Sequence, residues 1–230
     1  VMLLDIKKLI LPVSIGPGIM KSGHDGLPLR RGIETARRDG ATIVWCHNEW
    51  GLEALPSWLA GRIDAQNIFD GGIRSSYRDS FYRYLNAGLK VPFSTGTDWF
   101  MYDFSRVYVP VSGQLTSRNW LEQLSTGHSY ITNGPFLEFT VNRQPIGGTI
   151  SLAKRGQVRI RGRAVSRSDF QRIELVHNGG IVATAASRPV DGHHEATIDT
   201  NFDISRPGWF ALRTPPPSVS GDPKRMRKTP

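Results

Sequence analysis

Residues 41–51 read ATIVWCHNEWG, an apolar run that reaches a histidine, His47, and then turns sharply polar. A run that is apolar at nearly every position is typical of a parallel strand covered on both faces. His47 is therefore either a packed core residue or a ligand held at the end of a strand. The pattern of the neighbouring segments is needed to choose between these readings.

Helical and strand patterns alternate on both sides of this stretch. The spacing predicts helices over 27–40, 51–60, 77–88 and 118–127, and strands over 62–69, 90–100 and 106–111. In the first helix Leu29, Ile33 and Ala36 share one face, and Gly40 marks its end. Such alternation is typical of a mostly parallel sheet flanked by helices, so the fold class is α/β.

The pattern changes after Tyr130, where no further helix is predicted. Short runs at strand spacing follow, separated by turn signals such as Asn178-Gly179-Gly180. The predicted strands are 136–141, 148–152, 157–165, 172–179, 181–186, 194–199 and 208–213. We expect a small antiparallel β-sandwich over 134–213, followed by a disordered, basic, proline-rich tail over 214–230.

The formal charge of +9 is concentrated in two segments of the 230-residue chain. Residues 154–172 carry a net six positive charges and the tail carries a net three. Arg159, Arg161 and Arg163 alternate with small or apolar residues, so they share one face of a strand. A solvated outer face is the favoured reading and a surface for an anionic partner is the alternative; no nucleic-acid-binding motif accompanies the charge, so no nucleic-acid partner is expected.

Composition bounds the chemistry further. No apolar stretch approaches the roughly 18 residues that span a bilayer, so no membrane span is expected. Cys46 is the only cysteine, so any metal must be held by His, Asp or Glu. The chain opens on Val1 inside an apolar run, which reads as a piece of a longer protein and leaves the compartment undetermined.

Two predicted strands end on residues of the kind that bind metals. His47 ends the first, and Asp98 follows the Gly-Thr turn of the strand at 90–100. Imidazole with carboxylate suits Zn, Mn or Fe, and such a metal lowers the pKa of a bound water enough to make it a nucleophile near neutral pH. A hydrogen-bonded structural histidine and a turn-forming aspartate are the alternatives. His24, Asp25, Glu49, Glu53 and Asp70 are weaker candidates.

Several long motifs resemble, in order, the CehA/McbA-type metallohydrolases of the PHP (polymerase and histidinol phosphatase) group. The matching stretches are ATIVWCHNEWGLE, FYRYLNAGLKVPFSTGTDWF, SRVYV, NWLEQLSTGHSYITNGP and FQRIELVHNGG. The resemblance implies that residues 1–133 are the C-terminal part of a distorted (β/α)7 barrel, with a divalent metal at the strand ends. His47 then matches the histidine of the third PHP motif and Asp98 the aspartate of the fourth, while His24 lies near a histidine position of some relatives.

The chain also departs from this family. Its first two motifs, which carry further ligands, fall upstream of Val1, and Phe100 stands where many relatives have a histidine. After the strand at 208–213 the family has one more strand, where this chain has its basic tail. We therefore expect the chain alone to be inactive or nearly so, and the full-length parent to be secreted or periplasmic.

These observations predict a fragment of a metal-dependent hydrolase acting on a small-molecule ester, carbamate or phosphoester. Asp98 would also accept a proton from the attacking water, and Asn67, Arg106 and Asn133 would position substrate, a capping or loop-bracing role being the alternative for each. The alternative function is a non-catalytic carbohydrate- or protein-binding module built on the sandwich. Nucleic-acid binding is a third hypothesis that rests on the charge alone. The sequence leaves the oligomeric state open.

Overall fold

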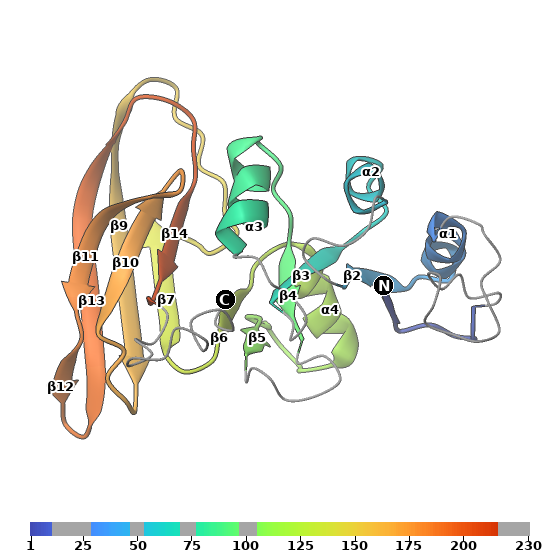
Figure 1. Cartoon of the computed structure of the whole chain (residues 1–230), viewed down its shortest axis with the longest axis horizontal. Helices are drawn as coiled ribbons and strands as arrows, with labels where there is room; N and C mark the ends of the chain where they lie inside the picture. Colours follow the sequence, from blue (N-terminus) through green and yellow to red (C-terminus); the bar gives the residue numbers. More distant parts are fainter. Residues whose placement is uncertain (11–28, 47–52, 70–76, 97–104, 216–230) are drawn as a thin grey trace, which may run out of the picture.

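A computed structural model describes residues 1–10, 29–46, 53–69, 77–96 and 105–215. The fold is mixed α/β and rich in sheet. In the described part of the chain, the helices are short and lie between Arg30 and Ser125 (Figure 1). His24, His47 and Asp98 lie outside the described residues.

The first half is built on a four-stranded sheet in the order β1-β2-β3-β4. Strands β2 (Thr42–Trp45), β3 (Ala65–Phe69) and β4 (Phe93–Thr95) are parallel, and β1 (Met2–Leu4) is an antiparallel edge. The parallel character of the strand at 41–47 was predicted correctly, whereas β1 was not predicted. A separate two-stranded sheet pairs β5 (Arg106–Tyr108) with β6 (Tyr130–Thr132). Within the described ranges these strands form open sheets, so a closed (β/α)7 barrel is not confirmed.

Helices cover both faces of the four-stranded sheet, as the apolar run of β2 requires. Ile43 and Trp45 of β2 pack with buried residues of α1 (Arg30–Arg38), while Val44 faces Leu124 of α4 (Ser117–Ser125). Alternate residues of one strand thus enter cores on opposite sides of the sheet. The remaining helices are the short α2 (Ala54–Leu59) and α3 (Tyr77–Asn86), which follow α1 along the chain.

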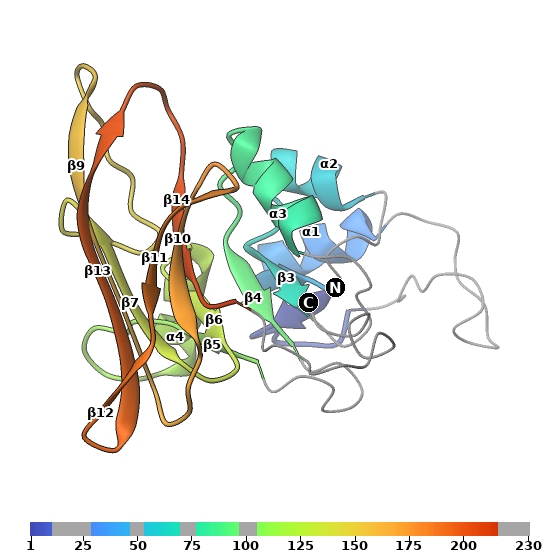
Figure 2. The ribbon, with the colours of Figure 1, turned by 60° about the vertical axis from the view of Figure 1, so that its left-hand side comes forward.

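The second half consists of two antiparallel sheets packed face to face (Figures 1 and 2). The five-stranded sheet has the order β12-β13-β9-β7-β8 and the three-stranded sheet has the order β11-β10-β14. Inward side chains from both sheets share one core, with Ile160 of β9 and Leu175 of β10 fully buried. The strands are β7 (Phe136–Val141), β8 (Gln144–Pro145), β9 (Gly156–Ser166), β10 (Arg172–His177), β11 (Gly180–Ala186), β12 (Arg188–Val190), β13 (His193–Ile204) and β14 (Phe210–Arg213).

One predicted strand is wrong. Residues 148–152 form no strand, and the chain instead makes the short strand β8 just before them. Asn142 and Arg143 both have positive φ, which closes a tight hairpin between β7 and β8. Pro145 has no N–H to continue the ladder, so β8 stops there and the following residues leave the sheet.

The three-stranded sheet lies between the five-stranded sheet and α3 (Figure 2). Val176 of β10 is fully buried against Phe81 and Tyr82 of α3. The Tyr82 ring lies 4.6 Å from that of Trp209, whose indole N–H donates to Asn86 Oδ1 at 2.8 Å. The two halves of the described chain are therefore joined by a packed, partly polar junction.

Candidate functional site

The carboxyl ends of β2, β3 and β4 meet at one edge of the four-stranded sheet, because these three strands are parallel neighbours. In open α/β sheets this edge is where ligands bind. Described residues toward this edge include Cys46, Asn67, Ser94 and Gly96. Cys46 is free and partly exposed.

Asn67 is the unusual residue of this edge. Its side chain is only 4% exposed, and it lies beside Ser94 of β4 in the register of the sheet. Asn67 Oδ1 is buried and has no hydrogen-bond partner in the described structure. Native proteins leave few buried acceptors unpaired, because such a group costs about 1–3 kcal/mol. An acceptor held in this state at a ligand-binding edge is a candidate to meet a ligand.

The backbone around Asn67 leaves little room for its amide to move. A β-bulge interrupts the pairing of β3 with β4 just after Asn67. A methyl group added at Gly96 would lie 3.2 Å from Asn67 Nδ2. The bulge sets the direction of the Asn67 side chain, and the missing side chain of Gly96 leaves room for its amide.

The preceding residue, Gln66, shows what a structural amide looks like in the same strand. Gln66 is 1% exposed and points to the opposite face, where its Oε1 accepts from Trp58 Nε1 at 2.8 Å. It therefore ties α2 to the sheet. Asn67 Oδ1 accepts no such hydrogen bond within the described structure, so the two neighbouring amides have different roles.

The other two predicted substrate-binding residues lie on or beside the two-stranded sheet. Arg106 begins β5 opposite Thr132, and its side chain is exposed, with Nη1 donating to the carbonyl of Ser105 at 2.8 Å. Asn133 is exposed in the turn that follows β6. Asn67 belongs instead to β3 of the four-stranded sheet, so the three predicted substrate-binding residues are divided between two sheets.

Glu53 is the one metal-site candidate among the described residues, and it has another role. The other six candidates lie outside them: His24, Asp25, His47, Glu49, Asp70 and Asp98. The Glu53 carboxylate accepts from the backbone N–H groups of Leu29 and Arg30 at 3.1 and 3.3 Å. It thus caps the start of α1, where a negative charge also complements the helix dipole. Glu53 therefore has a structural role rather than the role of a metal ligand.

No group of three or more His, Cys, Asp or Glu suited to a metal occurs among the described residues. The donor that this part of the chain contributes is the unpaired Oδ1 of Asn67, an uncharged oxygen of a kind that divalent metals and substrates both accept. A divalent metal at this edge would draw its remaining ligands from His47, Asp98 and His24. The chemistry of the described donor fits that group.

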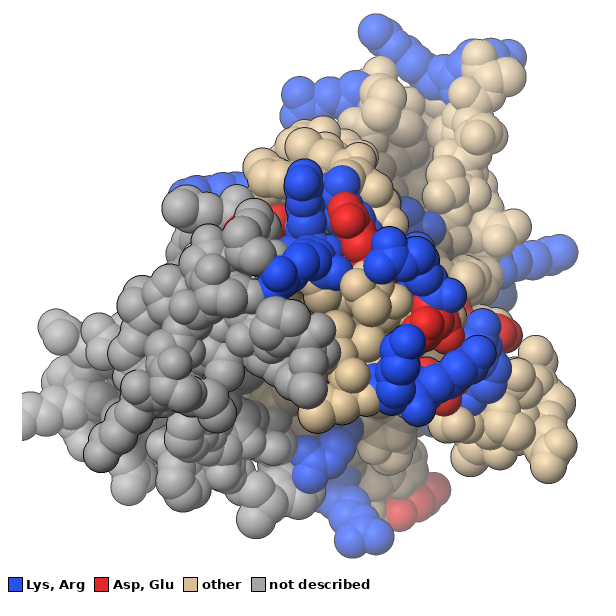
Figure 3. Space-filling model, turned by 90° about the vertical axis from the view of Figure 1, so that its right-hand side faces the viewer, with Lys and Arg blue, Asp and Glu red and all other residues tan. Residues whose placement is uncertain are grey.

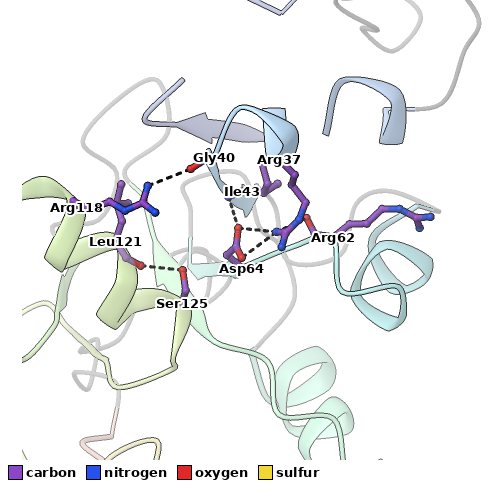
Figure 4. A network of polar contacts seen from close by, with 8 residues as sticks. All are labelled: Arg37, Gly40, Ile43, Arg62, Asp64, Arg118, Leu121 and Ser125. Atoms are coloured by element: carbon purple, nitrogen blue, oxygen red, sulfur yellow. Dashed lines mark hydrogen bonds and ion pairs between the residues drawn. The ribbon is translucent and has the colours of Figure 1, made fainter. Parts of the chain in front are cut away.

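At the opposite edge of the same sheet, polar contacts join α1, β2 and the start of β3. Asp64, just before β3, accepts from Ile43 N at 2.7 Å, and both of its oxygens lie 3.1 Å from Arg37 Nη1 (Figure 4). A hollow of about 270 Å³ opens beside it, and a second of about 320 Å³ lies between α2 and α3. Asn67 lines neither of them. The Asp64 carboxylate is therefore engaged in holding α1 and β2 to the start of β3.

The arginines of β9 form an ion-paired outer face. Arg159 makes a two-point contact with Asp199 at 2.9 Å, and Arg161 lies 3.3 Å from the same carboxylate. Arg163 makes a two-point contact with Glu195 of β13 and lies 3.5 Å from Glu138 of β7. Hydrogen bonds from Arg159 and Arg163 hold the pKa values of Asp199 and Glu195 below their usual range.

Charge is compensated in the same way near α1. Figure 3 shows basic side chains interleaved with acidic ones on that face of the molecule. Arg62 lies 3.0 Å from Glu34, and Lys8 lies 4.0 Å from Asp39. Like the named arginines of β9, these basic side chains lie beside carboxylates, which supports the solvated-face reading of the β9 arginines.

Comparison with known proteins gives one weak structural likeness. No protein-family model matches this chain, and no curated protein matches it. A search of solved structures finds a two-domain protein containing a predicted PHP-like metal-dependent phosphoesterase from Bacteroides vulgatus ATCC 8482, at 11% sequence identity and a TM-score of 0.39. The match covers 77% of this chain and 56% of that one, so this chain spans little more than half the length of its neighbour. The assignment to the CehA/McbA group stays a prediction.

Among the described residues, no helix is long and apolar enough to cross a membrane.

Proposed function

We propose that this chain is part of a metal-dependent hydrolase whose site lies at the carboxyl edge of β2, β3 and β4. The observation that carries the proposal is the buried, unpaired Oδ1 of Asn67 at that edge. The sequence places His47 two residues after the end of β2 and Asp98 three residues after the end of β4. Both residues follow strands that end at the same edge as β3, which agrees with a shared site.

In this proposal His47, Asp98 and His24 hold a divalent Zn, Mn or Fe ion. The ion supplies Lewis acidity, which lowers the pKa of water and polarises the bond to be cleaved. Asp98 accepts the proton that the attacking water loses. Asn67 contributes a fixed acceptor in a site with little water, and Arg106 and Asn133 orient the substrate. The bond is that of a small-molecule ester, carbamate or phosphoester, and the parent protein is secreted or periplasmic.

A pair of neighbouring substitutions tests the assignment of Asn67. Asn67→Leu removes an unsatisfied buried acceptor without changing the side-chain volume greatly, so the fold should keep its stability or gain about 1 kcal/mol. Gln66→Leu is the matched control, since it leaves Trp58 Nε1 without its acceptor and should cost about 1–3 kcal/mol. Urea unfolding of both variants gives the comparison.

Because this chain alone is expected to be inactive or nearly so, the functional readout is hydrolysis of 4-nitrophenyl acetate and 4-nitrophenyl phosphate by the full-length parent, with added Zn or Mn. We expect Asn67→Leu to lower any metal-dependent rate at least about tenfold while stability is kept. If Asn67→Leu instead destabilises the chain as much as Gln66→Leu, the oxygen has a structural partner and the proposal loses its main support.

A further inference from the structure

Three aromatic rings form an exposed group where β5, β6 and β7 come together. Tyr108 and Tyr130 face each other across β5 and β6, with ring centroids 5.2 Å apart and planes 13° from parallel. Phe136 stands nearly perpendicular to Tyr108, at 5.2 Å and 74°. We name Tyr108, Tyr130 and Phe136 the aromatic corner.

The aromatic corner faces outward from the core. Tyr108 is 37% exposed and Phe136 is 55% exposed. In β7 the alternate residues Leu137 and Phe139 enter the core shared by the two sheets, so Phe136 is on the opposite face of the strand. A phenylalanine left half in water gives up part of the stabilisation that burial would supply, about 25 cal/mol for each Å². The ring therefore has no evident structural reason to be at this position.

The corner is anchored rather than loose. Burial raises the pKa of Tyr130, and a hydrogen bond with the backbone of Leu137 opposes that rise. This contact fixes the Tyr130 ring against β7, and the stacked Tyr108 ring is fixed in turn. The aromatic surface is thus pre-formed, which reduces the entropic cost of binding a ligand.

Acidic and basic side chains lie next to the rings of the aromatic corner. Glu138 follows Phe136 on the same face of β7, is 71% exposed as a side chain, and lies 3.5 Å from Arg163 of β9. Arg163 is in turn paired with Glu195, so its charge is compensated. On the other side Arg106 shares the face of Tyr108 on β5. The corner therefore has polar neighbours but no surplus of one charge.

We propose that the aromatic corner, together with Glu138 and Arg163, binds a neutral carbohydrate. The C–H faces of a sugar ring pack on aromatic rings, and its hydroxyl groups donate to the carboxylate and accept from the guanidinium. A nucleic acid would need uncompensated positive charge beside the stacking rings, and here the arginine is neutralised. This site is independent of the metal-dependent activity proposed above and uses none of its ligands.

Affinity electrophoresis of the full chain through gels that contain soluble polysaccharides tests the proposal. The probes are xylan, mannan, mixed-linkage β-glucan and starch, with heparin as the polyanion. The variants are Phe136→Ala and Tyr108→Ala, and the control is Ile181→Ala on β11 of the other sheet, where the side chain is 49% exposed. Circular dichroism checks that each variant is folded, as expected for exposed positions.

We expect retardation of the wild-type chain by at least one neutral polysaccharide, weakened about tenfold or more in each aromatic variant and unchanged in Ile181→Ala. Failure of every neutral polysaccharide to retard the wild-type chain overturns the proposal. Retardation that survives both aromatic substitutions also overturns it, as does binding confined to heparin. Loss of metal-dependent hydrolysis would leave this result untouched, so the two proposals fail separately.

Discussion

The junction between the two halves of the chain depends on one buried carboxylate, Glu174 of β10. It is 2% exposed and faces α3 rather than the core between the sheets. Its Oε1 accepts from Arg172 at 2.6 Å and its Oε2 accepts from Arg213 Nε at 2.7 Å. Arg213 continues the network to the hydroxyl of Tyr82 on α3, at 3.3 Å. A substitution that removes only the charge of Glu174 should therefore weaken the whole junction.

The expected cost of Glu174→Gln follows from burial. The Arg213 side chain is 12% exposed and the Arg172 side chain is 44% exposed. Arg172 can turn to solvent, whereas Arg213 is buried and would lose the carboxylate that pairs with its Nε. Breaking a buried pair in this way costs about 3–5 kcal/mol, which at an m-value of about 2–3 kcal/mol/M lowers the urea midpoint by about 1–2.5 M.

The pH dependence has a definite sign. Burial alone would raise the pKa of Glu174, but hydrogen bonds from Arg213 and Arg172 outweigh it and hold the pKa below 4.5. A carboxyl group with a lowered pKa in the folded state contributes stability that is complete above its unfolded value and is lost as the pH falls through the folded value. The difference between wild type and Glu174→Gln should therefore be constant near neutrality and shrink as the pH drops below about 4.5.

Urea unfolding followed by tryptophan fluorescence measures this effect, because Trp209 contacts Tyr82 at the junction. Glu195→Gln is the control: it removes a carboxylate from a two-point contact with Arg163 at 2.9 and 2.8 Å, but on the outer face of β13. Its midpoint should move far less than that of Glu174→Gln. Equal midpoints for wild type and Glu174→Gln at pH 7, or equal shifts for the two variants, would refute the reasoning from burial.

Two further predictions concern local packing and capping. A methyl group added at Gly162 of β9 would lie 2.8 Å from Leu212 Cδ1 of the facing sheet, so Gly162→Ala should cost about 1–3 kcal/mol in urea unfolding. Gly156→Ala at the exposed start of the same strand, where nothing comes closer than 3.8 Å, is its control and should change little. Thr116 caps α4 by accepting from Asn119 N at 3.1 Å. Thr116→Ala should lower the stability by about 1 kcal/mol and Thr116→Ser should restore most of it, while an unchanged midpoint for Thr116→Ala would contradict the cap.

Most elements of the first half could be predicted because their signals are local. The apolar face of α1 and the glycine that ends it are visible in the sequence, and Gly40 has the positive φ that such an end needs. β2 shows its double-sided burial as a continuous apolar run. The edge strand β1 was not predicted, because its pairing with β2 is a contact between distant segments that no short window contains.

The candidate site was predictable only in part. Asn67 was selected as a polar residue near a strand end, but its unpaired oxygen depends on the bulge after it and on Gly96 from another strand. The aromatic corner was missed because its three rings come from three strands. One signal was available: Arg106 and Tyr108 alternate with Val107, which places them on one face of β5.

Metal binding by the full chain tests the central claim most directly. The purified protein is equilibrated with Zn, Mn or Fe, and bound metal is measured by mass spectrometry after gel filtration. The proposal predicts that the chain retains a divalent metal, that His47→Ala and Asp98→Ala each lower its retention, and that His193→Ala, in the β12–β13 turn region, does not. A chain that retains no metal, or one whose retention is unaffected by His47→Ala and Asp98→Ala, would contradict the assignment of this edge as a metal-dependent site.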